Sequence, residues 1–158
     1  MVLGSWALAN MSTGAYGWAN NKGENKYFNQ MNFFWNTVNL AISGYALYSN
    51  SYIDCTSLSD SVILNNHVDT ENLLLINSVL DVAYIGSGFL LKYLSDKYPD
   101  RADLLKGYGN SIILQGSFLL IFDLALYGIL NDLRSDFSDK IQIAFDYSKM
   151  GLNLCIKF

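Results

Sequence analysis

Residues 27–48, YFNQMNFFWNTVNLAISGYALY, decide the class of fold to which this chain belongs. Polar side chains recur in this stretch at steps of three and four residues, which confines them to an arc of roughly 80° on a helix. They are Asn29, Asn32, Asn36, Asn39 and Ser43. A surface helix of a soluble bundle needs the opposite pattern, with a narrow apolar stripe and a broad charged face. The stretch therefore predicts a helix in lipid, with its amides turned toward neighbouring helices.

Charged residues are scarce along the whole chain and nearly absent from four long segments, of which the last two are interrupted by Asp81 and Asp123. Asp, Glu, Lys and Arg make up 15% of the 158 residues, against about 25% in soluble domains. The four segments are long enough for the roughly 20 residues that cross a bilayer, and they lie at 1–19, 27–48, 72–94 and 107–131. The sequence thus predicts an all-α integral membrane protein, with a bundle of four transmembrane helices in residues 1–131.

The basic residues predict the orientation of these helices. Six of them flank two connections, whereas the connection at 49–71 holds none. The six are Lys22, Lys26, Lys92, Lys97, Arg101 and Lys106. Because cytoplasmic loops carry the excess of Lys and Arg, both termini are expected outside, in a bacterial inner membrane. Either a removed signal peptide precedes Met1, or the first helix itself acts as an export signal.

Residues 49–71 are expected to form a connecting loop on the outer face. Asp69, Thr70 and Glu71 offer a cap and a dipole partner for the start of the third helix. His67 is expected to be a solvated residue of this loop.

The hydrophobic period changes from helical to two after Asp132. Apolar side chains alternate with polar or small ones on both sides of a predicted turn at 148–151, so residues 132–158 are predicted to be an extramembrane tail with a short C-terminal β-hairpin. Cys55 and Cys155 both fall on the predicted outer, oxidising side. They are candidates for a disulfide, and two free thiols are the alternative.

Three stretches carry a resemblance to a known family: residues 27–48, LDVAYIGSGFLL at 80–91, and GYGNSIILQGSFLLIFDLALYGIL at 107–130. Together with WALANMSTGAYGWAN at 6–20, they resemble a family of small, uncharacterised, four-helix bacterial membrane proteins of unknown function. The resemblance implies a location and a topology. It implies no mechanism, and no catalytic residue is carried over from it.

Four polar residues lie at one depth in the predicted spans. Each is eight or nine residues from the outer end of its span, which at 1.5 Å per residue is roughly 12–14 Å. They are Asn10, Asn39, Asp81 and Asp123. No Lys or Arg lies at this depth, so the two carboxyl groups are expected to face amides, each other, water or a bound cation. Gln115, Asn36 and Tyr84 complete the set of candidate ligand- or ion-binding residues.

Two interpretations of this layer stay open. In one, it is an interhelical hydrogen-bond network that fixes the register of the helices. In the other, it is a proton or cation site, or the polar floor of a small-ligand pocket.

The residue types exclude several functions. One His and two Cys cannot build a zinc site, so neither a metal nor another cofactor is expected. A net charge of -4 without a basic stripe argues against nucleic acid as a partner. No nucleophile lies beside a base, so the chain is not expected to be an enzyme.

The function that these observations favour is that of a binding or structural subunit, an accessory component of a membrane complex. Its partners are then the lipid bilayer and a membrane protein or a second copy of the chain, bound through the helices or the hairpin. The alternative is a small transporter or a proton- or cation-conducting protein that uses Asp81 and Asp123.

Overall fold

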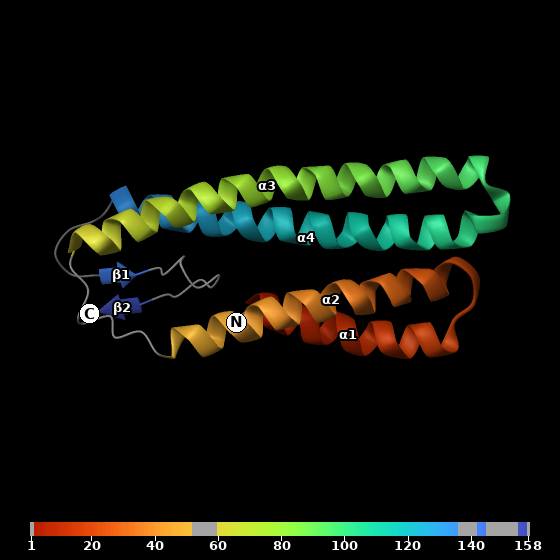
Figure 1. The fold of residues 1–158 in the computed structure, drawn as a ribbon, viewed down its shortest axis with the longest axis horizontal. Helices are drawn as coiled ribbons and strands as arrows, with labels where there is room; N and C mark the ends of the chain where they lie inside the picture. The colour runs from red at the N-terminus through yellow and green to blue at the C-terminus, as the bar shows by residue number, and fades with distance from the viewer. Residues whose placement is uncertain (1, 52–59, 136–141, 145–154, 158) are drawn as a thin grey trace. The chain divides into compact units, whose positions relative to one another are not determined.

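The computed structural model describes residues 2–51, 60–135, 142–144 and 155–157, and most of them are helical (Figure 1). The helices are α1 (Val2–Asn20), α2 (Gly23–Asn50), α3 (Asp60–Lys97) and α4 (Ala102–Ser135), with the short 3-10 helix η2 (Pro99–Arg101) before α4. Each of the four segments predicted to cross a membrane lies largely within one helix. The predicted all-α architecture of four helices is therefore confirmed.

Local sequence accounts for the two short connections. Gly23 has a φ of 58°, a left-handed conformation that glycine adopts without a steric penalty, and α2 begins there. Tyr98 has the extended backbone (φ -124°, ψ 77°) that a following proline favours. Pro99 therefore ends α3 and begins η2, and the third helix runs to Lys97, beyond its predicted end at residue 94.

The predicted loop at 49–71 is wrong over much of its length, because α3 begins at Asp60. Residues 60–71 are helical although they are polar. No Gly or Pro occurs between Gly44 and Gly86 to interrupt a helix, and an acidic residue in its first turn interacts favourably with the helix dipole. Thr70 and Glu71 consequently lie inside α3 and do not cap it.

Two three-residue strands are described in the tail. β1 (Gln142–Ala144) pairs antiparallel with β2 (Cys155–Lys157), with Ile143 opposite Ile156. The predicted turn at 148–151 lies outside the described residues, and the hairpin stays a prediction. Cys55 also lies outside them, and so does the predicted disulfide.

The chain divides into two compact units that cut across the helices. Unit 1 comprises Met1–Ala41 and Val79–Ile121, and unit 2 comprises Ile42–Ser78 and Phe122–Phe158. Unit 1 thus contains α1, the first part of α2, the last part of α3 and the first part of α4.

Glycine allows the helices of unit 1 to approach one another closely. A Cβ on Gly88 of α3 would lie 2.8 Å from the carbonyl oxygen of Gly109 of α4. A Cβ on Gly107 would lie 2.5 Å from the carbonyl oxygen of Glu24 of α2, and one on Gly14 of α1 would lie 2.9 Å from that of Asn29. Only residues without a side chain permit such backbone contacts, which are typical of helices packed in a membrane.

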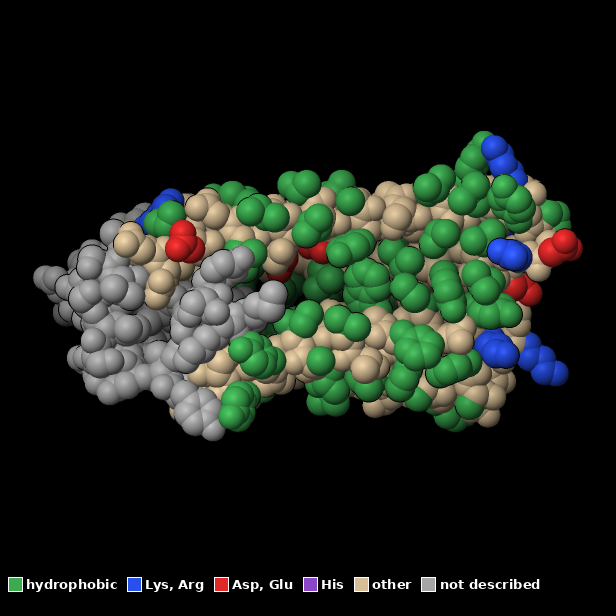
Figure 2. Space-filling view, viewed as in Figure 1, with side chains coloured by type: hydrophobic (Ala, Val, Ile, Leu, Met, Phe, Trp, Pro, Cys, Tyr) green, Lys and Arg blue, Asp and Glu red, His purple; other side chains and the backbone are tan. Residues whose placement is uncertain are grey.

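Burial in the described residues is inverted relative to a water-soluble protein. Asn36 and Gln115 have no exposed surface, whereas Val79 and Ile121 are each 70% exposed. Four hydrophobic residues are buried (Ala7, Leu74, Ile112 and Leu130), against thirteen polar or charged ones. Hydrophobic side chains accordingly cover much of the visible helix surface in Figure 2. A soluble domain buries its large apolar side chains and exposes its polar ones.

Two segments of the described residues, Asn65–Lys97 and Pro99–Arg134, are long and apolar enough to cross a membrane. Neither α1 nor α2 is among these segments. Asn, Ser, Thr and Gly recur along α1, and α2 contains Glu24 and Lys26 besides its row of asparagines.

Candidate functional site

Four residues from three helices of unit 1 form a closed ring of hydrogen bonds, here called the amide ring. Trp6 of α1 donates from Nε1 to Gln115 Oε1 of α4 at 2.9 Å, and Gln115 Nε2 donates to Asn32 Oδ1 of α2. Asn32 Nδ2 donates to Asn10 Oδ1 at 3.0 Å. Asn10 Nδ2 closes the ring on the carbonyl oxygen of Trp6 at 2.9 Å. The amide ring therefore links α1, α2 and α4 through specific polar contacts.

Two further residues support the amide ring. Asn36, one turn after Asn32, donates from Nδ2 to the Asn32 carbonyl oxygen at 2.8 Å and to Oδ1 at 3.2 Å. The indole of Trp6 stacks on Phe118, with ring centroids 3.9 Å apart and planes inclined by 2°. The stacked ring fixes the direction in which Trp6 Nε1 points, so the indole acts as an oriented donor.

The structure thus brings three of the seven predicted site residues, Asn10, Asn36 and Gln115, into one network. Two members of this network were missed as site residues. Asn32 lies at the centre of the polar stripe of α2, and that position could have identified it. Trp6 has no such signal, because an indole in an apolar helix is also expected wherever packing alone is needed.

Three buried polar atoms on α2 and α3 of unit 1 have no hydrogen-bond partner among the described residues. They are Asn36 Oδ1, Asn39 Nδ2 and Asp81 Oδ2, and their side chains are 94% buried or more. We call Asn36, Asn39 and Asp81 the Asp81 site. Buried polar groups in proteins are almost always satisfied, so each such atom requires an explanation.

The packing of the helices places Asn39 and Asp81 at the same level of unit 1, and Asn36 lies about one turn before Asn39 on α2. A Cβ on Gly116, the residue after Gln115, would lie 3.2 Å from the carbonyl oxygen of Asp81. The rings of Trp35 and Tyr84 meet edge to face at 5.0 Å and join α2 to α3. Helices α2 and α3 run antiparallel (Figure 1). The residue one turn after Trp35 in α2 therefore lies level with the residue one turn before Tyr84 in α3. Asn39 and Asp81 are the residues at that level.

The other two predicted site residues lie elsewhere. Tyr84 is 39% exposed and packs against Trp35, so its ring contributes to the α2–α3 contact. Asp123 is buried, but it belongs to unit 2. A site shared by Asp81 and Asp123 stays a prediction.

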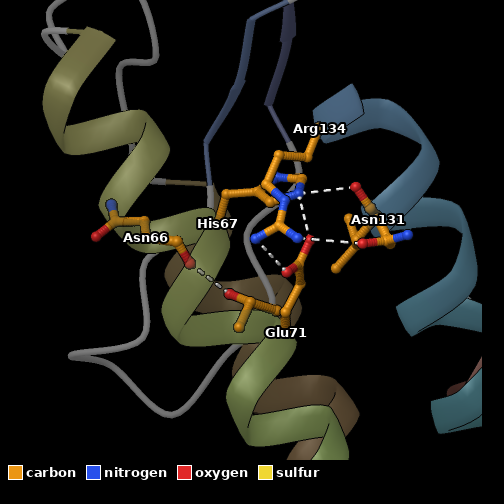
Figure 3. Close-up of polar contacts among 7 residues, drawn as sticks. Asn66, His67, Glu71, Asn131 and Arg134 are labelled. Carbon is orange, nitrogen blue, oxygen red and sulfur yellow. Dashed lines mark hydrogen bonds and ion pairs between the residues drawn. The ribbon is translucent and has the colours of Figure 1, made fainter. Parts of the chain in front are cut away.

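Unit 2 contains a second buried polar cluster, centred on His67 (Figure 3). His67 Nε2 lies 3.1 Å from Glu71 Oε1 and 2.8 Å from the Leu130 carbonyl oxygen. Arg134 Nη1 lies 3.0 Å from Glu71 Oε2, and its Nη2 donates to Asn131 Oδ1 at 3.1 Å. The cluster therefore joins α3 to the end of α4.

The expectation of a solvated His67 is wrong. The residue is fully buried in α3, because the helix begins earlier than predicted and turns His67 and Glu71, one turn apart, toward α4. Both neighbours of Nε2 are acceptors, so this nitrogen carries a hydrogen. The Glu71 carboxylate meets the imidazole on one oxygen and the Arg134 guanidinium on the other.

Neither cluster has the composition of a transition-metal site. Within the described part of the chain, no group of three or more His, Cys, Asp or Glu side chains could hold a metal ion. Amides predominate in the amide ring, and amides hydrogen-bond and coordinate without changing their charge. The side chains of the amide ring are therefore suited to binding and to helix association.

Comparison with known proteins gives one match. No curated protein and no solved structure matches the sequence. A family model described as a family of unknown function, DUF6992, matches residues 2–124, a range that includes the amide ring and the Asp81 site. The chain belongs to this family of unknown function, DUF6992.

Proposed function

We propose that this chain is a four-helix integral membrane protein that acts as a binding or structural subunit of a membrane complex and not as an enzyme. The inverted burial of the described residues carries this proposal. In water, the exposed apolar side chains along α2, α3 and α4 would be costly, whereas in lipid they are in their preferred solvent. The amide ring then supplies the interhelical hydrogen bonds that hold such helices together.

The distribution of charge supports a single orientation in the membrane. The six basic residues of unit 1 lie in or near the connections between α1 and α2 and between α3 and α4, and Lys and Arg gather at this end in Figure 2. We place this end in the cytoplasm and both termini outside, in a bacterial inner membrane. All four helices cross the bilayer in this arrangement, and the tail with its β-hairpin lies outside.

The partner is a membrane protein or a second copy of the chain. The helix surfaces offer apolar contacts, and the predicted hairpin offers a strand edge to a partner's sheet. Purification of the full chain in mild detergent, followed by mass spectrometry, would identify what accompanies it.

Substitution of an outward-facing residue tests the membrane proposal directly. Val79→Lys would place a charge in the lipid and should lower stability or insertion by about 2.5–3.5 kcal/mol. If residue 79 faced water, the same change should cost no more than about 0.5 kcal/mol. Asp100→Lys, in the connection before α4, is the matched control and should be tolerated. A Val79→Lys protein as stable as the control would refute the proposal.

A small transporter or a proton- or cation-conducting protein is the second candidate. The observation that favours it is the burial of Asp81, which has an oxygen without a partner among the described residues. Flux measurements in proteoliposomes test this function. Asp81→Asn and Asp123→Asn should each abolish conduction, whereas Asp96→Asn, which changes an exposed carboxylate, should not.

A further inference from the structure

We propose that the Asp81 site binds one small monovalent cation, with Asp81, Asn36 and Asn39 as oxygen ligands. The inference rests on the proposed membrane location at one point. Lipid around the helices leaves a buried carboxylate without water. It assigns the ion to three named residues of unit 1 and requires no contribution from Asp123.

The electrostatic argument begins with the isolation of the Asp81 carboxyl group. Among the described residues of unit 1, it is the only buried charged side chain. The basic residues of this unit lie near the ends of its helices. Lys92, the nearest of them along α3, is about 16 Å away at 1.5 Å per residue. A carboxylate in such an environment is strongly disfavoured unless a positive charge compensates it.

The neighbouring atoms have the chemistry of a hard-cation site. Asn36 Nδ2 donates to Asn32, which leaves Oδ1 as an oriented acceptor. Asn39 Nδ2 has no partner among the described residues, so a half-turn of this amide group would put a third oxygen in its place. Amide and carboxylate oxygens are the ligands that hard cations prefer. Ser111 Oγ is also unpartnered, but it lies one turn from Gln115 on the side away from Asn36.

The number of carboxylates selects the charge of the ion. One carboxylate and one monovalent cation form a neutral pair, which is the arrangement that a medium of low dielectric favours. A divalent ion would keep one uncompensated charge there. The competing ways to satisfy Asp81 are a proton on the carboxyl group and a bridging water, and neither responds to the identity of the salt.

Thermal unfolding of the detergent-solubilised full chain tests the proposal. The melting temperature is measured in rising NaCl, KCl or LiCl, with choline chloride keeping the ionic strength constant. At least one of the three salts should raise the melting temperature to a plateau, because a ligand that binds only the folded state stabilises it. The rise should vanish in Asp81→Asn and persist in Asp96→Asn, whose carboxylate lies on the same helix and is exposed.

A second variant keeps the test decisive if Asp81→Asn does not fold. Asn39→Ala should shift the midpoint of the salt response by about tenfold to higher concentration, since it removes one ligand and no charge. The proposal is overturned if the three salts act like choline chloride, or if the rise persists in Asp81→Asn. If Val79→Lys destabilises the protein but none of the salts does more than choline chloride, only this inference is refuted. A saturable response in a protein indifferent to Val79→Lys would refute only the membrane proposal.

Discussion

At Asn32, four hydrogen bonds converge on one amide. Its Nδ2 donates to the carbonyl oxygen and Oδ1 of Asn10, and its Oδ1 accepts from Asn36 and Gln115. Asn32→Ala should therefore destabilise the protein by about 1–2 kcal/mol, the upper range for side-chain hydrogen bonds within a membrane. Thr37→Ala, on the outer face of the same helix, removes only a bond to the Phe33 carbonyl oxygen one turn earlier and should cost no more than about 0.5 kcal/mol.

The free energy of unfolding in mixed micelles measures both variants. Equal stability of the two would show that the amide ring contributes nothing to the association of the helices. The stacking of Trp6 on Phe118 provides a further readout, since loss of the Gln115 bond should alter the fluorescence of this indole.

The sequence predicted the polar face of α2 from the spacing of its asparagines, and Asn32, Asn36 and Asn39 are indeed buried. Spacing within a helix says which face is polar but not which partner each side chain meets on another helix. Asn32 could therefore not be distinguished from its neighbours as the centre of a ring. The partner of Trp6 lies 109 residues away, and no local pattern contains that information.

Two glycines of α3, Gly86 and Gly88, should respond in opposite ways to substitution by alanine. A Cβ on Gly88 would meet Ile113 Cγ1 at 2.6 Å and the Gly109 carbonyl oxygen at 2.8 Å, whereas a Cβ on Gly86 meets nothing within 4 Å. Gly88→Ala should destabilise the protein by about 1–3 kcal/mol through overpacking. Gly86→Ala should be neutral or stabilise it by up to about 1 kcal/mol, because alanine is the better helix former. Thermal unfolding of the pair in detergent measures the difference. A stable Gly88→Ala protein would mean that the two backbones are not in contact.

The ion pairs formed by Arg134 and by Lys106 should differ in strength. Arg134 meets the buried Glu71 carboxylate at 3.0 Å, whereas Lys106 meets the exposed Asp96 at 3.9 Å. Arg134→Met should destabilise the protein by about 1.5–3 kcal/mol, because a buried carboxylate loses a charged donor. Lys106→Met, the matched control, should cost no more than about 1 kcal/mol. A chemical unfolding curve for each variant gives the comparison, and equal losses would contradict the burial of Glu71.

The existence of the four helices could be predicted from long uncharged segments, but the start of α3 could not. Residues 60–71 are as polar as a loop, and polarity alone favours a connection. Their helical state depends on tertiary contacts, in which His67 and Glu71 reach Leu130 and Arg134 on α4. Such contacts routinely override the preference of a local segment.

For the whole chain, the proposed orientation predicts which positions a membrane-impermeant thiol reagent can reach. In a protein with Cys55 and Cys155 replaced by Ser, Ser51→Cys should react in intact cells, since the connection between α2 and α3 lies outside. Lys22→Cys should react only after permeabilisation. Lys22 is preferable to Gly23 for this purpose, because the φ of 58° at Gly23 disfavours any side chain. Labelling of Lys22→Cys in intact cells would show that the orientation is the reverse of the one proposed.

The amide ring can close only late in the synthesis of the chain. Trp6 must find Gln115, which is synthesised 109 residues later. At roughly 5–20 residues per second, and with the helices in the proposed membrane location, the Trp6 donor waits about 5–20 s without its partner. During that interval, the nascent chain resembles a damaged protein to any quality-control protease that recognises polar groups in lipid. Its yield in the cell should therefore depend on the speed of translation, and slow codons between α3 and α4 should favour its degradation over its assembly.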